Sequence, residues 1–436
     1  MGRARRKLFI LLGAGSSVSV GVPGVRQIDA LMHEWAAAEG VFEGERHTPN
    51  YYDLAWQAVG DHYAGSRGES DAAQNFEIAL AQMLALANWV RPRPFGRPLR
   101  DLIGATDQIP HYFAENRDLD MSPTRFGPSV SVQTLYSTLI GKLADHMRKV
   151  SIDLTVERSE SFDKYVHIFE RLRERFEVGT YSLNYDNLAL RANPQTFVGF
   201  SESLDADGCR IFDPEAVYRR PEWDFLYHLH GSIHYTLPLF GSVRSEMHEG
   251  IRWRDDLRGE FQSANTHGGS IMDQRSDGTD IPATTLVAGG QKLDQMLTEP
   301  FQAMYASLAR HAHEADAFLI AGYGFGDMHV NRALLSRMSR PGTKPPVVIL
   351  EWTPSGIQTM TSRPDGWPRR LRYAFGFGGP NFDLIPGTVA GLQRRRWFEQ
   401  GQGHVAVWHN GFLEAIERLD VILDALDGNW KAIRYD

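Results

Sequence analysis

Short runs of consecutive apolar residues recur along the chain, separated by longer stretches with helical spacing. In the first of them, residues 8–12, five apolar residues stop at Gly13, which is the pattern of a strand buried on both faces. Similar runs predict strands at residues 178–183, 225–229, 284–287, 317–321 and 347–350. Because helical stretches separate several of these runs, the sequence predicts an α/β fold whose parallel sheet has helices on both faces.

The spacing of apolar residues also predicts the helices. They are expected at residues 25–38, 76–90, 131–150, 162–176, 300–315, 328–338 and 410–426. Several of them fall between the first two strands, which predicts a large helical insertion at about 40–175. The proline-rich stretch 91–128 is expected to be irregular, and the polar stretch 240–281 is expected to be a long surface excursion. Residues 356–436 are expected to form a C-terminal extension, with a helix, packed on the main domain.

Composition and charge narrow the class of protein. The chain has 436 residues and a net charge of −8, which argues against a nucleic-acid-binding surface as its main feature. Its one cysteine, Cys209, excludes an internal disulfide and a cysteine-rich zinc site. No apolar run approaches the roughly 20 residues of a membrane helix, and no secretory cleavage pattern follows the basic start. We therefore expect a cytoplasmic protein that binds neither membranes nor, directly, nucleic acid.

The first predicted strand leads into a glycine turn and then a helix. Gly13 and Gly15 allow the backbone to turn tightly and to approach a ligand closely, and Ser17 adds a hydroxyl. A strand, a glycine turn and a helix N-terminus can together bind a phosphate. The usual dinucleotide fingerprint has a third glycine where this chain has Val18, so this motif alone is a weak signal.

Two polar residues follow the second predicted strand. Asn184 and Asp186 alternate, so both side chains can point to the same side, and polar residues at the C-terminal end of a parallel strand face the ligand crevice. An Asn-Asp turn that caps the next helix explains the same two residues. Taken alone, this structural explanation is preferred.

Three histidines lie around the end of the third predicted strand. His228 and His230 share a face, and His234 lies beyond Gly231. They suggest a metal site, but no acidic residue or cysteine lies beside them and the glycine turn separates them, so no metal is predicted. His230 lies at the mouth of the sheet, where a general base is suited, and His228 is interpreted as a core or supporting histidine.

Two later strands also end in residues suited to a nucleotide. Gly322 and Gly324 follow the strand at 317–321 and permit close backbone approach to a ribose or phosphate. Asp327 is interpreted as the cap of the next helix. Glu351 ends the strand at 347–350, where a carboxylate can bind the hydroxyls of an adenosine ribose or simply face solvent.

Four motifs at these strand ends together resemble a known family. They are Gly13-Ala14-Gly15-x-Ser17, Asn184-Tyr185-Asp186, Leu229-His230-Gly231 and Gly322-Tyr323-Gly324-Phe325-x-Asp327. In this order they are similar to the sirtuin-like NAD-cleaving domains of bacterial anti-phage defence proteins, over residues 8 to about 352. The pair Phe76-Glu77 in the predicted insertion is also similar to a feature of that group.

Two departures separate the chain from the protein-deacylating sirtuins. Those enzymes carry a four-cysteine zinc ribbon, whereas this chain has only Cys209. Their Gly-Ile-Pro-Asp-Phe-Arg loop is here Gly21-Val-Pro-Gly-Val-Arg26 and lacks the acid and the aromatic residue. Both differences argue against removal of acyl groups from lysine, but neither argues against NAD binding or cleavage.

The resemblance implies a Rossmann-like, sirtuin-like catalytic domain over residues 1–355 that hydrolyses NAD, its substrate, to nicotinamide and ADP-ribose without zinc. It implies that Asp186 recognises the nicotinamide carboxamide, that Asn184 places the ribose hydroxyls or the attacking water, and that His230 accepts a proton. The residues expected to bind the rest of NAD are Gly13, Ala14, Gly15, Ser17, Pro23, Arg26, Gly322, Gly324 and Glu351.

Two alternatives and one expectation about assembly remain. The chain is alternatively an NAD-dependent protein deacylase, or a non-catalytic subunit of a defence complex that senses NAD or ADP-ribose. The presence of both Asn184 and His230 favours catalysis. Because a free NAD hydrolase is toxic to its own cell, we expect gated activity in a homo-oligomer. The resemblance also implies a protein partner, such as a HerA-like ATPase or a short Argonaute.

Overall fold

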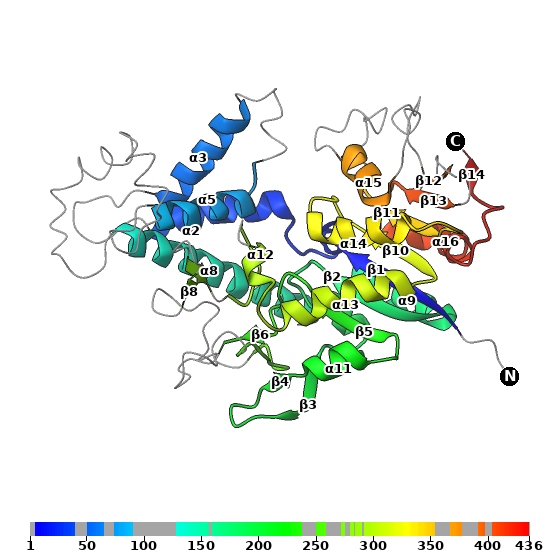
Figure 1. The fold of residues 1–436 in the computed structure, drawn as a ribbon, viewed down its shortest axis with the longest axis horizontal. Helices are drawn as coiled ribbons and strands as arrows, with labels where there is room; N and C mark the ends of the chain where they lie inside the picture. The colour runs from blue at the N-terminus through cyan, green and yellow to red at the C-terminus, as the bar shows by residue number, and fades with distance from the viewer. Residues whose placement is uncertain are drawn as a thin grey trace.

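The chain is built around one large sheet, shown in the computed structural model in Figure 1. The structure describes residues 5–39, 50–64, 74–89, 128–156, 159–237, 250–258, 272–274, 280–282, 284–289, 292–353, 367–376, 391–396 and 403–435. Within these residues, the strand order of the sheet is β14-β12-β13-β11-β10-β1-β2-β5. The strands are β1 (Arg6–Leu12), β2 (Phe176–Ser182), β5 (Asp224–His228), β10 (Ala317–Ala321), β11 (Val347–Leu350), β12 (Leu392–Arg396), β13 (His404–Trp408) and β14 (Arg434–Tyr435).

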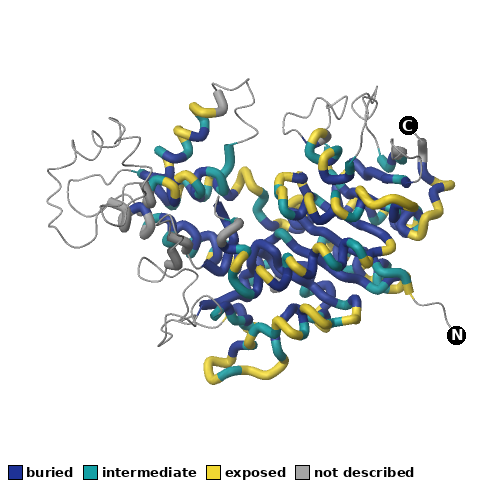
Figure 2. Tube along the Cα trace, in the orientation of Figure 1, coloured by how far each residue is buried: buried dark blue, intermediate teal, exposed yellow. Residues whose placement is uncertain are grey.

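Strands β13, β11, β10, β1, β2 and β5 run parallel, and β12 alone pairs antiparallel, with β13. The predicted α/β fold with a mostly parallel sheet is therefore confirmed. β1 lies inside it, and its side chains alternate between two cores: Leu8, Ile10 and Leu12 enter one, Phe9 and Leu11 the other. Figure 2 shows the sheet as the buried centre of the molecule.

Helices cover both faces of the sheet. Helix α9 (Glu160–Arg175) and helix α16 (Leu419–Leu426) pack on the face to which Leu8 points. Helix α13 (Phe301–Glu314) and helix α14 (Met328–Met338) pack on the opposite face, with helix α15 (Trp367–Phe375) beside α14. These two helical layers explain why the strands are continuous apolar runs rather than alternating ones.

A group of helices lies between β1 and β2 in the sequence and beside the sheet in space, at the left of Figure 1. It consists of α2 (Val25–Glu39), α3 (Tyr51–Ala64), α5 (Phe76–Trp89) and α8 (Pro128–Val156). Tyr136 of α8 is fully buried, and its hydroxyl donates a hydrogen bond to the carbonyl of Ala288 at 3.1 Å. The helical insertion therefore contacts the segment 284–289, which lies next to the end of β5.

Two predicted elements differ from the structure. Residues 284–287 form no strand of the sheet. Leu286 makes an isolated antiparallel bridge with Gly231, because this segment runs back past the end of β5. The predicted helix 410–426 is a 3₁₀ helix, η3 (Leu413–Arg418), followed by α16. The predicted irregular stretch 91–128 lies, but for its last residue, outside the described residues, as does most of 240–281.

Smaller elements complete the described fold. A second sheet has the order β3-β4-β7-β6 and was not predicted, because its strands are short. The remaining elements are β3 (Phe200–Leu204), β4 (Arg210–Phe212), β6 (Tyr235–Thr236), β7 (Arg252–Trp253), β8 (Met272–Gln274), β9 (Asp280–Pro282), α1 (Gly15–Val18), α10 (Leu188–Ala192), α11 (Pro214–Arg219) and α12 (Lys292–Gln295).

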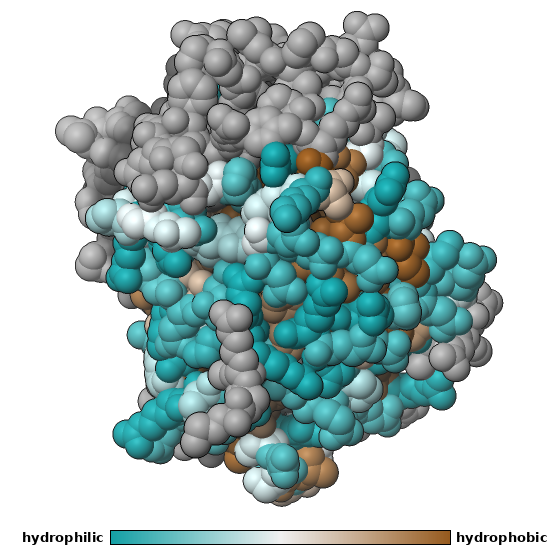
Figure 3. Space-filling view, turned by 90° about the vertical axis from the view of Figure 1, so that its right-hand side faces the viewer, coloured by the Kyte–Doolittle hydropathy of each residue, from teal (hydrophilic) through white to brown (hydrophobic). Residues whose placement is uncertain are grey.

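The face of the molecule that Figure 3 shows is mostly hydrophilic, with scattered hydrophobic areas. Surface ion pairs join α9 to the C-terminal helix, among them Arg175 with Asp424 at 2.9 Å and Arg171 with Asp420 at 3.0 Å. Such exposed pairs each contribute little, about 0–1 kcal/mol. None of the helices in the described ranges combines the length and the apolar character needed to cross a membrane.

Candidate functional site

The predicted site residues come from strand ends that meet at one edge of the sheet. Leu12, the last residue of β1, pairs with Ser182 of β2 and with Ala321 of β10. Because these strands are parallel and in this register, the segments that follow them leave the sheet side by side. The motifs identified at separate places in the sequence therefore lie next to one another.

Three glycines at this edge pack directly on each other. A Cβ on Gly322 would lie 2.2 Å from the backbone nitrogen of Ser16, and a Cβ on Gly13 would lie 2.5 Å from the carbonyl oxygen of Gly322. Gly322 also has a φ of +60°, which favours glycine. The backbone nitrogen of Gly15 donates to the carbonyl of Gly322 at 3.0 Å. These glycines therefore let two turns approach each other, whereas a Cβ on Gly324 would meet open space.

Asn184 fixes the turn after β1. Its Nδ2 lies 3.1 Å from the carbonyl of Gly13, 3.2 Å from Ser16 Oγ and 2.9 Å from Ser17 Oγ. Its Oδ1 is buried and has no hydrogen-bond partner within the described part of the chain. Leaving a buried carbonyl oxygen unpaired costs about 1–3 kcal/mol, so Oδ1 is suited to accept a hydrogen bond from a ligand.

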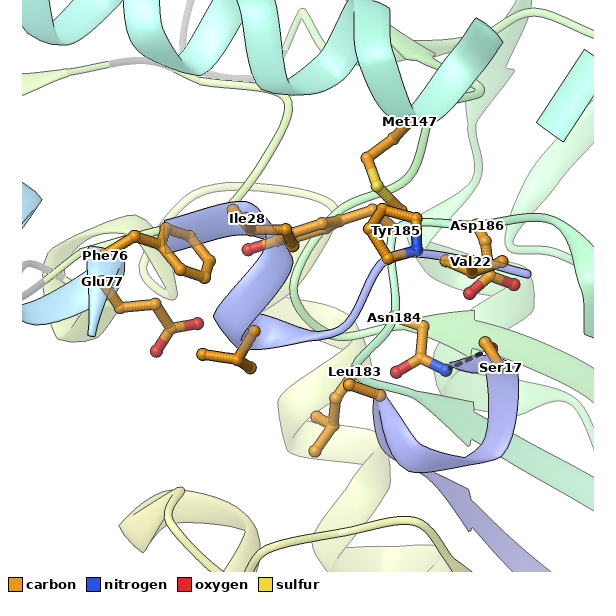
Figure 4. A pocket seen from close by; sticks show the side chains of 13 residues that line it. Ser17, Val22, Ile28, Phe76, Glu77, Met147, Leu183, Asn184, Tyr185 and Asp186 are labelled. Atoms are coloured by element: carbon orange, nitrogen blue, oxygen red, sulfur yellow. Dashed lines mark hydrogen bonds between the residues drawn. The ribbon is translucent and has the colours of Figure 1, made fainter. Parts of the chain in front are cut away.

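A cavity of about 80 Å³ opens beside Asn184, between the sheet edge and the helical insertion (Figure 4). Its lining residues come from the turn after β1, from α2, α5 and α8, and from the segment after β2. They are Ala14, Ser17, Val22, Pro23, Val25, Ile28, Phe76, Glu77, Met147, Leu183, Asn184, Tyr185 and Asp186. The cavity is mainly apolar, with the polar groups of Ser17, Asn184, Asp186 and Glu77 on its walls.

Asp186 is both a turn residue and part of the cavity wall. Its Oδ1 accepts a hydrogen bond from the backbone nitrogen of Leu188 at 3.0 Å, at the start of α10. Its Oδ2 is buried without a partner among the described residues. Burial raises the pKa of Asp186, while the hydrogen bond from the backbone of Leu188 and the nearby Ser17 hydroxyl oppose this shift. The turn explanation therefore holds for Oδ1, and Oδ2 remains available to a ligand.

His230 forms a buried pair with Asp327. His230 Nε2 lies 2.8 Å from Asp327 Oδ2, and both side chains are less than a tenth exposed. Asp327 Oδ1 accepts from the backbone nitrogens of His329 and Val330, so its predicted role as the cap of α14 is confirmed. The pairing with His230 could not be predicted, because 97 residues separate the two.

Burial and the neighbouring charges shift the pKa values of both groups of this pair. Burial and the charge of Lys292 lower the pKa of His230, although Asp327 opposes the shift. Burial alone would raise the pKa of Asp327, but the hydrogen bond from His230 and the charges around it bring this pKa well below its usual range. We therefore describe a neutral imidazole that donates from Nε2 to an ionised carboxylate.

A second pair joins the insertion to the core. Lys292 Nζ, at the start of α12, lies 2.8 Å from Glu77 Oε2, in the first turn of α5. Burial would lower the pKa of Lys292, but Glu77 and Asp327 raise it. Lys292 therefore carries a charge that acts on the cavity wall through Glu77 and on the pair of His230 and Asp327.

The other two histidines of the motif have structural surroundings. His228 Nδ1 donates to the carbonyl of Asn184 at 3.4 Å. His234 stacks on Trp253 with ring centroids 4.4 Å apart, and its Nδ1 donates to the carbonyl of Arg254 at 2.7 Å. Burial lowers the pKa of His228 to about 3 and that of His234 to about 4. In the described ranges, no group of three or more His, Cys, Asp or Glu side chains is placed to hold a metal ion.

The predicted site residues therefore divide into those that line the cavity and those around it. Ala14, Ser17, Pro23, Asn184 and Asp186 line it. The remaining ones are Gly13, Gly15, Arg26, His230, Gly322, Gly324 and Glu351. Of these, Arg26 is exposed on α2, and Glu351 follows β11, four strands away from β5 in the sheet.

Comparison with known proteins agrees with this architecture. Residues 179–363 match the family described as SIR2-like domain, a range that begins within β2 and contains the motifs after β2, β5 and β10. No curated protein sequence matches the chain. This part of the chain, residues 179–363, is therefore similar to a sirtuin-like domain.

The solved structures that match the chain include Sir2 homologues. A mutant Sir2 homologue in complex with 2′-O-acetyl ADP-ribose is 13% identical, with 85% of this chain and 94% of that chain covered and a TM-score of 0.31. A Sir2 homologue in complex with NAD is 13% identical, with 80% of this chain and 78% of that chain covered and a TM-score of 0.29.

Proposed function

We propose that this protein is an NAD glycohydrolase, which cleaves NAD to nicotinamide and ADP-ribose. One observation carries the proposal. The cavity lined by Asn184 and Asp186 and the buried pair of His230 and Asp327 lie at the same edge of a parallel sheet, in a sirtuin-like domain. Ligands of open parallel sheets bind at this edge.

The cavity suits the nicotinamide end of the substrate. At about 80 Å³ it is smaller than the roughly 300 Å³ of the smallest usual ligand pockets, so it admits only a part of the dinucleotide. The unpaired Asp186 Oδ2 and Asn184 Oδ1 can accept hydrogen bonds from the carboxamide nitrogen and a ribose hydroxyl. The remainder of NAD would lie along the sheet edge, where Gly324 leaves open space.

His230 has the form that a general base requires. The Asp327 carboxylate accepts from Nε2, which leaves the lone pair on Nδ1, and Nδ1 has no hydrogen-bond partner among the described residues. A neutral imidazole can take a proton near pH 7, and the adjacent Asp327 stabilises the imidazolium that forms.

The reaction balances with water as the only co-substrate. The bond between ribose C1′ and the nicotinamide nitrogen breaks, and its electron pair stays on nicotinamide. The oxygen of water bonds to C1′, and its proton passes to His230 Nδ1 and then to solvent. One NAD and one water thus give nicotinamide, ADP-ribose and one proton.

The proposal is tested by steady-state NAD turnover of two variants. His230→Ala should lower kcat by roughly 10²- to 10⁴-fold, the usual contribution of a positioned general base. His228→Ala should keep most of the turnover, although loss of a buried side chain will lower its stability. Equal losses of turnover in both variants, with metal bound to the wild-type protein, would indicate a metal site instead of a general base.

We further propose that the activity serves anti-phage defence and is gated by self-association or by a partner protein. The support for this step is chemical: uncontrolled NAD cleavage would deplete the cell that makes the enzyme. Both a HerA-like ATPase and a short Argonaute fit the resemblance in the sequence, and the neighbouring genes would identify the partner.

A further inference from the structure

The cavity wall contains one charged group that the proposed mechanism does not use. Glu77 comes from α5 of the helical insertion, while Asn184 and Asp186 come from the segment after β2. Figure 4 places Glu77 and Asn184 at opposite sides of the cavity. The insertion therefore contributes a carboxylate to a site that is otherwise built from the ends of the sheet strands.

The position of Glu77 is fixed by the start of α5. Asp29 Oδ1 of α2 accepts from the backbone nitrogen of Phe76 at 2.7 Å, and Asn75 Oδ1 accepts from that of Ile78 at 3.1 Å. Phe76 itself is buried and lines the cavity. The first turn of α5 is thus held from two sides, which orients the side chain of Glu77 toward the cavity.

The segment 284–289 connects Glu77 to His230. The backbone nitrogen of Val287 donates to the carbonyl of His230 at 2.8 Å. Gly289 packs on α5 with a φ of +96°, and a Cβ there would lie 3.5 Å from the carbonyl oxygen of Glu77. The same segment thus contacts the backbones of Glu77 and His230, so the two side chains are held in one arrangement.

The two carboxylate oxygens of Glu77 have different surroundings. Oε2 pairs with Lys292 at 2.8 Å, whereas Oε1 has no hydrogen-bond partner in the described part of the chain. The side chain is about a third exposed, at 32%. Lys292 therefore positions the carboxylate and leaves one oxygen free for a ligand.

We propose that Glu77 is a further catalytic residue of the NAD hydrolase described above, an inference that rests on that function. Its Oε1 accepts a hydrogen bond from a hydroxyl of the nicotinamide ribose. As the bond to nicotinamide breaks, positive charge moves onto the ribose ring, and a hydroxyl bound to a carboxylate stabilises this charge better than one bound to water. Lys292 acts as a positioning residue.

The test compares Glu77→Gln, Lys292→Met and a control with wild-type protein. Glu170→Gln makes the same chemical change on the exposed side of α9 and should keep wild-type turnover. Glu77→Gln should lower kcat by roughly 10²- to 10³-fold, as removal of an electrostatic stabiliser does, with ADP-ribose affinity changed less than about threefold. Lys292→Met should lower kcat less than Glu77→Gln does, since the Glu77 carboxylate remains.

A substrate analogue separates a catalytic role from a structural one. For NAD that lacks one hydroxyl of the nicotinamide ribose, the Glu77→Gln penalty should shrink at least tenfold, because the lost contact is absent in both proteins. The same penalty on NAD and on both deoxy analogues, or equal losses in Glu77→Gln and Lys292→Met, would make Glu77 a structural anchor and overturn the inference.

The remaining outcomes are also distinct. If wild-type protein cleaves NAD and Glu77→Gln keeps its turnover within about threefold, the inference fails while the proposed function stands. If wild-type protein does not cleave NAD with its partner present, both fail. Should Glu77→Gln not fold, Glu77→Asp, which withdraws the carboxylate by one methylene group, carries the same expectations.

Discussion

Replacing Gly322 with alanine tests the packing on which the whole site depends. The new Cβ would lie 2.2 Å from the nitrogen of Ser16 and 2.5 Å from the Cα of Gly15, where ordinary contacts are longer than about 3.4 Å. The turn after β1 must therefore move by more than 1 Å, on the order of the difference between these distances. Asn184, which is hydrogen-bonded to that turn, would lose its position as well.

The expected loss of stability in Gly322→Ala has two parts. A non-glycine residue at a φ of +60° costs about 1–2 kcal/mol, and overpacking of a close contact typically costs about 1–3 kcal/mol. We therefore expect Gly322→Ala to lower the free energy of unfolding by about 2–5 kcal/mol. NAD turnover should also fall, since the displaced turn carries Ser17 and supports Asn184.

Gly324→Ala is the matched control. The same atom is added two residues away, but the Cβ meets nothing within 4 Å, so the stability should change by no more than about 0.5 kcal/mol. If NAD lies over Gly324, KM should rise in this variant while the unfolding transition stays in place. Equilibrium urea unfolding of both variants is the assay, and equal stabilities would refute the packing argument.

Three further outcomes are expected. Asn184→Ala should abolish turnover and also lower the free energy of unfolding by about 1–3 kcal/mol, since its amide binds the turn after β1; an unchanged urea midpoint would contradict this. His228, His234 and His311 are buried with lowered pKa values, to about 3, 4 and 3. The unfolded chain binds protons that the folded protein does not, so stability should fall as the pH drops below about 6.5. At pH 5.5 each histidine should lower the free energy of unfolding by about 1.4 kcal/mol. Urea unfolding at about pH 5.5 and at a pH well above about 6.5 measures this loss. NAD turnover across a protein dilution series, with light scattering, should show activity that changes with oligomeric state; constant specific activity in a monomer, unaltered by the partner, would refute gating.

The sheet could be predicted because its strands are continuous apolar runs. The sequence predicts strands at residues 317–321 and 347–350 with the bounds that the structure has, since burial on both faces leaves no polar position in them. The polar residues that follow were then expected at one edge, and the parallel register places them there. The run at 404–408 carries the same signal but was not recognised as β13.

The parts that could not be predicted depend on contacts between distant residues. Lys292 and Glu77 are 215 residues apart, and neither neighbourhood indicates the other. The sequence predicts that Asp327 caps a helix, which it does, but a cap uses one carboxylate oxygen and leaves the second for His230. Likewise, the sequence predicts that Gly13 and Gly322 allow close approach to a ligand. In the structure they also allow two turns to approach each other.

Analysis of the products formed without an acyl-lysine acceptor distinguishes an NAD glycohydrolase from a deacylase and from an NAD sensor. Purified protein, with its genetic partner present, is mixed with NAD, and nicotinamide and ADP-ribose are quantified with and without an acetyl-lysine peptide. An NAD glycohydrolase should form equal amounts of the two products, at the same rate whether or not the peptide is present, and His230→Ala should lose both. Nicotinamide release that requires the peptide and yields acetylated ADP-ribose would identify a deacylase. Binding of NAD without release of nicotinamide would identify a sensor, and either result would rule out the proposed hydrolase.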